Sequence, residues 1–184
     1  ALFLAAGSVR PPPPQTPEVS PGSIHAGGSL NCAIMTQGGL KCWGYGYGMS
    51  MLWNNRSIDM GTGQSAVGLS VSGSVFTNST TIPYYHQICA VLNNGTLKCW
   101  NQTETPNNQH PPVNLGTNVS VAAVATRAII PTFESGHACA ILSDGRVKCW
   151  GHNGFGQLGL GHNTPILHAD QMGDALPAVD LGPG

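Results

Sequence analysis

Hydrophobic and polar positions alternate along this chain in short runs, and one such pattern is written three times. Each copy passes from an apolar run through a polar residue and a glycine to a second apolar run; the copies occupy residues 32–43, 89–100 and 139–150. A polar residue followed by glycine between two apolar runs is the strongest short-range sign of a β-hairpin. The regular recurrence of this hairpin indicates a repeat architecture.

Two stretches outside the hairpins alternate apolar residues with small polar ones, at residues 66–76 and 119–127. This period of two predicts a further strand before the second hairpin and another before the third. No stretch combines a helical period with capping residues at its ends. The sequence therefore predicts an all-β chain.

The length of the hairpin turn follows from the cysteines that flank it. In the second copy, a two-residue loop at Asn94 and Gly95 would place Cys89 and Cys99 on opposite faces. A three-residue loop ending at Gly95, with that glycine in the left-handed conformation, places the two cysteines directly opposite each other. They then occupy a non-hydrogen-bonded site, where opposing Cα atoms lie about 4.5 Å apart, within reach of a disulfide.

The same count applies to every copy, and it uses all the cysteines of the chain. Zinc is the alternative ligand, but spacers of nine residues do not match the short C-x₂₋₄-C pattern of structural zinc sites. We therefore predict disulfides and no metal, with the pairs Cys32–Cys42, Cys89–Cys99 and Cys139–Cys149.

A tryptophan follows the second cysteine of each copy, at Trp43, Trp100 and Trp150. Side chains alternate across a strand, so these tryptophans lie on the face opposite the cysteines. A large aromatic side chain at a recurring strand position is typical of a core residue. We expect all three to pack between neighbouring sheets.

The composition adds a prediction about the cellular compartment. Charged residues make up only 8% of the chain, compared with roughly 25% in ordinary soluble domains. Five N-glycosylation acceptor sequences supply another source of solubility; their asparagines are Asn55, Asn78, Asn94, Asn101 and Asn118. Attached glycans and three disulfides together predict a secreted or extracellular, cell-surface glycoprotein.

The charge and hydropathy patterns exclude two classes of partner. The seven basic residues form no cluster and the net charge is −1, so we expect no nucleic-acid binding. No apolar run approaches 18 residues, so we expect no membrane span.

The first 22 residues differ in composition from the rest. Residues 1–8 are apolar and are predicted to form a short strand that pairs with a sheet edge of this chain or of a neighbour; alternatively, they belong to a longer polypeptide. Four prolines, Pro11, Pro12, Pro13 and Pro14, predict an extended polyproline arm, which together with Thr16 is a candidate for O-linked glycosylation. We therefore divide the chain into this arm, 1–22, and three repeats, at about 23–65, 66–115 and 116–184.

The third copy resembles a known repeat. Its hairpin leads into a G-x-N-x-x-G-Q-L-G-x-G run, formed by Gly151, Asn153, Gly156, Gln157, Leu158, Gly159 and Gly161. This run is the hallmark of the regulator-of-chromosome-condensation repeat, and the cysteines make the chain similar to the secreted, disulfide-containing branch of that family in microbes and green algae. Residues 172–182 resemble the connection between repeats in that branch. Repeats one and two lack the Gln-Leu-Gly run.

The resemblance implies a β-propeller, whose blades are four-stranded sheets and number seven in the archetype. Three hairpins correspond to about three blades, so the expected fold is a partial or open propeller in which each blade carries a disulfide-stapled hairpin. Such an array leaves sheet faces and strand edges open at its two ends. We expect other protein chains, including further copies of this one, to cover them.

Catalysis has little support in the sequence. The eight acidic residues are scattered, and the seven histidines show no metal-binding spacing. His137, close to Cys139, is interpreted as a structural hydrogen-bonding residue. The nuclear member of the family is an exchange factor for a small GTPase, an activity that we do not transfer to a disulfide-containing chain. We expect no enzyme activity and no cofactor.

Two functions remain. The first is a structural building block of a cell-surface or filamentous assembly, with subunits joined in a homo-oligomer or fibre through open propeller edges and the N-terminal arm. Insertion of one subunit into the edge of the next is a heterologous contact, which extends into a filament when it does not close. The alternative is a protein-binding, recognition or inhibitor-like propeller module within a longer, closed seven-bladed propeller.

Overall fold

The computed structural model describes residues 19–44, 56–74, 85–101, 110–127 and 136–182. Residues 1–18 of the predicted arm (1–22) lie outside the described residues. They include its apolar segment, its four consecutive prolines and Thr16, and the proposals for them remain predictions.

The described residues form three antiparallel sheets, as predicted for an all-β chain. The first sheet contains, in order, β1 (Val19–Gly27), β2 (Leu30–Met35), β3 (Leu40–Gly44) and β4 (Arg56–Ile58). The second contains β5 (Ala66–Ser74), β6 (Tyr85–Leu92) and β7 (Leu97–Asn101). The third contains β8 (Val121–Arg127), β9 (His137–Leu142) and β10 (Val147–Gly151), and two single-turn 3₁₀ helices follow it, η1 (Ala169–Gln171) and η2 (Gly173–Ala175).

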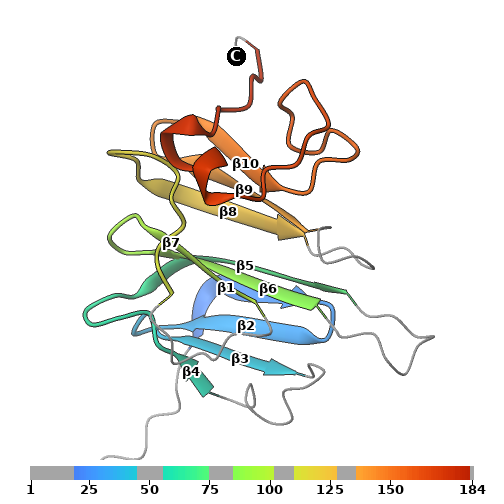
Figure 1. The fold of residues 1–184 in the computed structure, drawn as a ribbon. Coiled ribbons are helices and arrows are strands. Elements are labelled where there is room, and N and C mark those ends of the chain that lie inside the picture. Colours follow the sequence, from blue (N-terminus) through green and yellow to red (C-terminus); the bar gives the residue numbers. More distant parts are fainter. Residues whose placement is uncertain (1–18, 45–55, 75–84, 102–109, 128–135, 183–184) are drawn as a thin grey trace, which may run out of the picture.

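The three sheets lie face to face as a stack, with the second between the first and the third (Figure 1). The first strands of neighbouring sheets approach one another, β1 with β5 and β5 with β8. This arrangement is that of consecutive blades of a β-propeller, in which the first strand of every blade lies on the same side. The predicted fold of three propeller blades is therefore confirmed.

Each hairpin has the predicted three-residue loop. In the second blade, the backbone N–H of Leu92 donates to the carbonyl of Thr96 at 2.8 Å, and the N–H of Gly95 donates to the carbonyl of Leu92 at 2.8 Å. Gly95 has a φ of 79°, in the left-handed region that glycine occupies without a steric penalty. This loop places Cys89 opposite Cys99 in the register of β6 and β7.

The three predicted disulfides are confirmed. Each joins residues paired across its hairpin, with Cα–Cα distances of 4.0 Å for Cys32–Cys42 and 4.1 Å for both Cys89–Cys99 and Cys139–Cys149. The described residues contain no free cysteine.

Alternation along β6 shows how the stack holds together. Ile88, Ala90 and Leu92 point to one face and belong to the core shared with the first sheet. Cys89 and Val91 point to the other face and belong to the core shared with the third sheet. The middle sheet is thus apolar on both faces, as a sheet between two others must be.

The first strand begins within the segment predicted to be the arm, residues 1–22. β1 begins at Val19 and pairs with β2 despite Pro21. Its register shifts between Val19 and Ile24, which marks a β-bulge or similar irregularity. Proline is tolerated at bulges and on edge strands because no ladder hydrogen bond is needed from its nitrogen.

Candidate interaction surfaces at the ends of the sheet stack

Neighbouring blades are joined by a backbone contact at the hairpin tip. The carbonyl of Gly38 in the first blade accepts a hydrogen bond of 2.8 Å from the N–H of Ala66, where β5 begins. The carbonyl of Gly95 in the second blade accepts a hydrogen bond of 2.8 Å from the N–H of Val121, where β8 begins. The first two hairpin tips therefore each bind the first residue of the first strand of the next blade. We call this the tip contact.

A lysine forms a second contact between blades. Lys98 in β7 donates to the carbonyl of Met60 at 2.9 Å, in the linker that leaves the first blade. Lys148, at the same position in β10, donates to the carbonyl of Leu115 at 2.7 Å and to that of Gly173 at 2.9 Å. We call this the lysine contact. Backbone carbonyls satisfy the ammonium group in both places.

Burial changes the electrostatics of the lysine in the third blade. The side chain of Lys148 is buried, and removal of the ammonium group from water lowers its pKa. The charge of Arg146 lowers the pKa further, whereas Asp174 and Asp144 act in the opposite direction. A buried cation is costly unless its donors are hydrogen-bonded, so the two carbonyls are necessary partners.

The acceptor of each lysine contact lies in a repeated tripeptide. The tripeptides are Asp59-Met60-Gly61 and Asn114-Leu115-Gly116, in which the first side chain accepts a hydrogen bond from the N–H of the glycine, at 2.9 Å and 3.1 Å respectively. Both glycines have a positive φ, which permits this tight turn. The middle residue packs into the core between blades: Met60 is 4% exposed and Leu115 is 2% exposed.

The chain contains a third copy of this tripeptide, Asp180-Leu181-Gly182. Asp180 accepts a hydrogen bond of 2.9 Å from the N–H of Gly182, whose φ of 76° is again positive. The preceding residue, Val179, donates to the carbonyl of Val147 at 2.8 Å, just as Val113 donates to the carbonyl of Leu97 at 2.7 Å. Leu181, however, is 76% exposed. The turn is formed, but its middle side chain is in solvent.

At the opposite end of the stack, the outer face of the first sheet carries the lysine position of the same interface. Lys41 in β3 occupies the register position of Lys98 and Lys148, and within the described residues it has no carbonyl acceptor. Ile24 in β1 is exposed, whereas Leu69, at the same position in β5, is buried. The outer face of the first sheet therefore carries residues of the kind that bind a preceding blade.

The exposure of the three tryptophan side chains depends on their position in the stack. Trp100 is 1% exposed and belongs to the core between the first and second sheets. Trp150 is partly buried against the core between the second and third sheets. Trp43 is 38% exposed, and its packing between sheets stays a prediction. Each tryptophan faces the preceding sheet, and no described sheet precedes the first.

The run that follows the third hairpin folds around one buried amide. Asn153 is fully buried; its Nδ2 donates to the carbonyls of His162 at 2.8 Å and Thr164 at 2.9 Å. Its Oδ1 accepts from the N–H of Leu158 at 3.0 Å. An amide that bonds three backbone groups fixes the path of residues 153–164, which explains why the run requires asparagine.

The tip of the same loop presents an aromatic side chain. The Oε1 of Gln157 accepts a hydrogen bond of 2.9 Å from the N–H of Phe155, and its Nε2 lies 2.8 Å from the Nδ1 of His152. Phe155 is 92% exposed. Gln157 thus holds the backbone at a fully exposed phenylalanine.

Two of the predicted glycosylation sites lie in described loops, and both asparagines are exposed. Asn94 is at the tip of the second hairpin, where its Oδ1 accepts from the N–H of Thr96 at 3.1 Å and from the hydroxyl of Thr96 at 2.7 Å. Asn118 lies in the linker to the third blade. Asn55 and Asn78 lie outside the described residues, as does the side chain of Asn101 at the end of β7. All five remain predicted sites.

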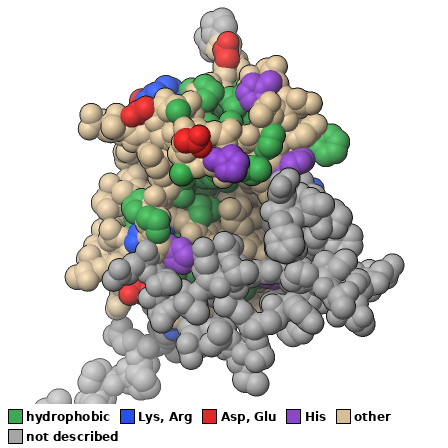
Figure 2. Space-filling model, in the orientation of Figure 1, with side chains coloured by type: hydrophobic (Ala, Val, Ile, Leu, Met, Phe, Trp, Pro, Cys, Tyr) green, Lys and Arg blue, Asp and Glu red, His purple; other side chains and the backbone are tan. Residues whose placement is uncertain are grey.

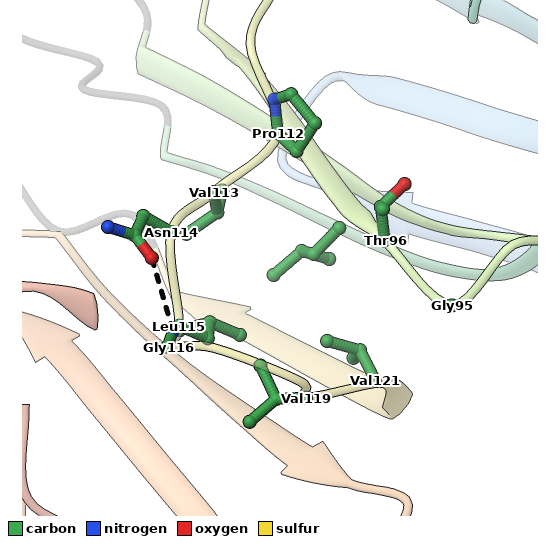
Figure 3. A pocket seen from close by; sticks show the side chains of 10 residues that line it. Gly95, Thr96, Pro112, Val113, Asn114, Leu115, Gly116, Val119 and Val121 are labelled. Carbon is green, nitrogen blue, oxygen red and sulfur yellow. Dashed lines mark hydrogen bonds between the residues drawn. The ribbon is translucent and has the colours of Figure 1, made fainter. Parts of the chain in front are cut away.

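A cavity of about 300 Å³ lies beside Asn94, between the second hairpin and the linker to β8 (Figure 3). Figure 3 shows the side chains of Val113, Leu115, Val119 and Val121 around it. Its ten lining residues are all uncharged: Gly95, Thr96, Leu97, Pro112, Val113, Asn114, Leu115, Gly116, Val119 and Val121. Thr96 supplies a hydroxyl, and the lining places no histidine or carboxylate beside it.

The titratable residues that the structure describes are dispersed. Among the described residues, no three histidine, cysteine or acidic side chains lie close enough together to hold a metal ion. The pKa of the partly buried His137 is lowered by burial and, to a smaller extent, by the charges of Arg127 and His152.

Charged side chains are sparse on the face shown in Figure 2. No helix within the described ranges is long and apolar enough to cross a membrane.

The sequence interpretation missed the interblade lysines and the tripeptides that receive them. The signal was present: a lysine precedes the second cysteine in all three hairpins, and an Asp/Asn–Leu/Met–Gly tripeptide occurs three times. A charged residue that recurs at one position of an otherwise apolar strand indicates a specific buried partner.

Comparisons with known proteins support the repeat assignment. The family model of the regulator of chromosome condensation (RCC1) repeat matches residues 135–157. Among solved structures, the fold is similar to that of Prp20p from Saccharomyces cerevisiae, with a TM-score of 0.51 and 17% identity over 76% of this chain and 34% of that one. The chain thus spans about a third of the length of Prp20p. A comparison with curated proteins found no match. The chain carries RCC1-like propeller repeats with a disulfide in each hairpin.

Proposed function

We propose that this chain is an extracellular glycoprotein that acts as a building block of a cell-surface or filamentous assembly. It joins other protein chains through the two end faces of its sheet stack and has no catalytic role. One observation carries the proposal: positions that are buried between the inner blades are occupied by exposed apolar residues at the ends, Trp43 at one end and Leu181 at the other. Exposed apolar surface with this recurring pattern is typical of a protein-binding face.

The extracellular location rests on the covalent chemistry of the chain. Three disulfides, one in every hairpin, are stable in oxidising compartments and rare in the cytosol. The exposed asparagines Asn94 and Asn118 each begin a glycosylation sequence and are accessible to a glycosyltransferase. Their glycans would add polar surface to a chain with few charges.

Light scattering on the native glycoprotein tests the proposal directly. We expect the particle mass to exceed the mass of the single glycosylated chain and to rise with concentration, because chains associate through the end faces. Mass spectrometry of the chain before and after enzymatic deglycosylation supplies the monomer mass and the glycan content. A native particle that stays monomeric at all concentrations would contradict the assembly role.

A second candidate is a recognition module that binds an unrelated protein through blade loops. The observation that favours it is Phe155, fully exposed on a loop whose backbone is fixed by Asn153 and Gln157. A rigidly presented aromatic side chain is a common anchor in protein interfaces. Prp20p, the similar solved structure, binds Gsp1p and histones. This candidate predicts a monomeric particle, part of a longer closed propeller, whose partner binding is lost in Phe155→Ala.

A further inference from the structure

We infer that the open face of the third blade binds the first blade of a second copy of this chain, with Lys41 donating a hydrogen bond to the carbonyl of Leu181. The inference rests on the proposed function, because it assigns the residues through which the chains join. A second copy of the chain fits each end of the stack, since each end carries the half of the interface that the other lacks.

The acceptor half of the lysine contact is already in its bound form. Asp180 and Gly182 hold the carbonyl of Leu181 in the same turn that presents the carbonyls of Met60 and Leu115 to their lysines. The hydrogen bond from Val179 to Val147 fixes this turn against β10. No rearrangement of the backbone is needed before a lysine binds, which lowers the entropic cost of association.

The donor half is present on the first blade. Lys41 pairs with Ala33 across β2 and β3, as Lys98 pairs with Ala90 and Lys148 with Ala140. Its side chain therefore leaves the strand at the position from which the other two lysines reach the linker of the preceding blade. A second copy placed at this end supplies that linker through Leu181.

The tip contact repeats the same complementarity. Gly145, at the third hairpin tip, is the counterpart of Gly38 and Gly95, whose carbonyls accept from the next blade. A methyl group added to Gly38 or Gly95 would meet the serine of the next blade, whereas one added to Gly145 would meet nothing within 4 Å. The partner is Val19, which is exposed and stands opposite Met35 as Ala66 stands opposite Leu92.

Apolar side chains surround both contacts. On the third blade, Ile141 is 46% exposed, whereas Val91 at the same position of the second blade is 1% exposed. Leu181 lies in the segment that follows the third blade. On the first blade, Ile24 and Trp43 provide the complementary surface. A second copy would bury these four side chains as their counterparts are buried between the inner blades.

The predicted contact is heterologous, because it joins the third blade of one copy to the first blade of the next. Such a contact repeats in one direction and yields either a closed ring or an open filament. A pair of single-face variants therefore has a distinctive behaviour. Leu181→Asp blocks the third-blade face, and Trp43→Asp blocks the first-blade face, but each variant keeps the other face intact.

We would measure particle mass by sedimentation velocity for native protein, for both variants and for their equimolar mixture. The native protein is expected to assemble, and each variant alone to remain monomeric, with the association constant lowered by about tenfold or more. The mixture is expected to form dimers that do not extend, because one intact face is available on each variant. Val67→Asp, which adds the same charge to an exposed apolar residue of the middle blade, should assemble normally.

A separate variant tests the hydrogen bond. Lys41→Met keeps most of the apolar stem, removes the ammonium donor and should weaken assembly without a change in melting temperature. Circular dichroism and intact disulfides confirm that each variant is folded.

The outcomes separate the inference from the proposed function. If native protein assembles and both single-face variants assemble equally well, the chains join elsewhere and the inference is overturned. A mixture that fails to form dimers overturns it too, because the two faces then do not bind each other. If native protein is monomeric throughout, or its end faces are covered by further blades of a longer chain, the proposed assembly itself fails.

Discussion

A lysine buried between two sheets needs acceptors for its ammonium group, and Lys148 has them in the carbonyls of Leu115 and Gly173. The carbonyls belong to two different segments, so one side chain fixes the linker and the turn after η1 against β10. The buried charge is thus satisfied by the dipoles of two backbone carbonyls.

Replacement of this lysine should destabilise the fold. Lys148→Met keeps the stem and leaves two carbonyls without their donor, so the free energy of unfolding is expected to fall by about 1–3 kcal/mol. Arg146→Met is the matched control, because Arg146 is exposed and pairs with Asp144 across the turn. Denaturant unfolding with intact disulfides measures both. Equal effects of the two substitutions would show that the buried contact is not stabilising.

Asp174 provides a test by pH. Hydrogen bonds from the backbone N–H and then the hydroxyl of Thr117 hold the pKa of this carboxyl below its usual 3.8. Since the folded pKa is lower than the unfolded one, the stabilisation is complete above pH 3.8 and is lost as the pH falls through the folded value. Asp174→Asn should therefore be less stable than the native protein at neutral pH, and this difference should narrow in acid.

Unfolding by urea at a series of pH values from neutral to acidic measures that difference. Asp170→Asn, which alters an exposed carboxylate four residues away, serves as the control and should follow the native pH dependence. A stability difference between Asp174→Asn and native protein that is constant with pH would contradict the assignment.

At the scale of the element, each hairpin combines a turn, a disulfide and a contact with the next blade. The left-handed glycine closes the turn, and the same residue offers its carbonyl to the following blade in the first two copies. The local fold and the packing of blades therefore depend on one position. Gly95 and Gly145 share this backbone conformation and differ in what lies beside them.

That difference can be measured by alanine substitution. Gly145→Ala should cost about 1–2 kcal/mol, from the left-handed backbone alone. Gly95→Ala carries the same strain, and its added methyl group would also collide with the side chain of Ser120 in the linker to the third blade. The second substitution should thus cost roughly 1–3 kcal/mol more, as an overpacked site does. Similar free energies of unfolding for both variants would contradict the tip contact.

At the scale of the molecule, position in the stack decides how many faces of each repeat are covered by neighbouring sheets. The middle blade is covered on both faces, and each outer blade is covered by a neighbouring sheet on one. Repeats of this kind gain stability from contacts with their nearest neighbours. Equivalent residues should therefore contribute unequally to stability.

The tryptophans provide the comparison. Trp100→Ala empties a site between two sheets and should lower the free energy of unfolding by about 3–5 kcal/mol. Trp43→Ala should cost less than half of that in dilute protein, because its side chain is already partly in solvent. Thermal and denaturant unfolding at low concentration measure the monomer. A loss for Trp43→Ala as large as for Trp100→Ala would mean that the first blade is covered in the monomer as well.

The sequence was sufficient for whatever depends on neighbours along the chain. The strand alternation, the three-residue loop at Gly95 and the opposition of Cys89 and Cys99 follow from a period of two and one left-handed residue. The propeller, by contrast, was implied by the resemblance of the run around Asn153 to a known repeat, and the loop and the cysteine pairing were not. These features are local, so no knowledge of the packing was needed to predict them.

The tertiary structure alone decided which face of each blade meets another blade. Lys41, Lys98 and Lys148 occur in the same sequence context, yet among the described residues only the last two contact a linker. Met60, Leu115 and Leu181 likewise occupy the middle position of three copies of one tripeptide, and the first two are buried whereas Leu181 is exposed. Burial and hydrogen bonding between blades depend on residues far apart in the chain, and identical local patterns therefore acquire different environments.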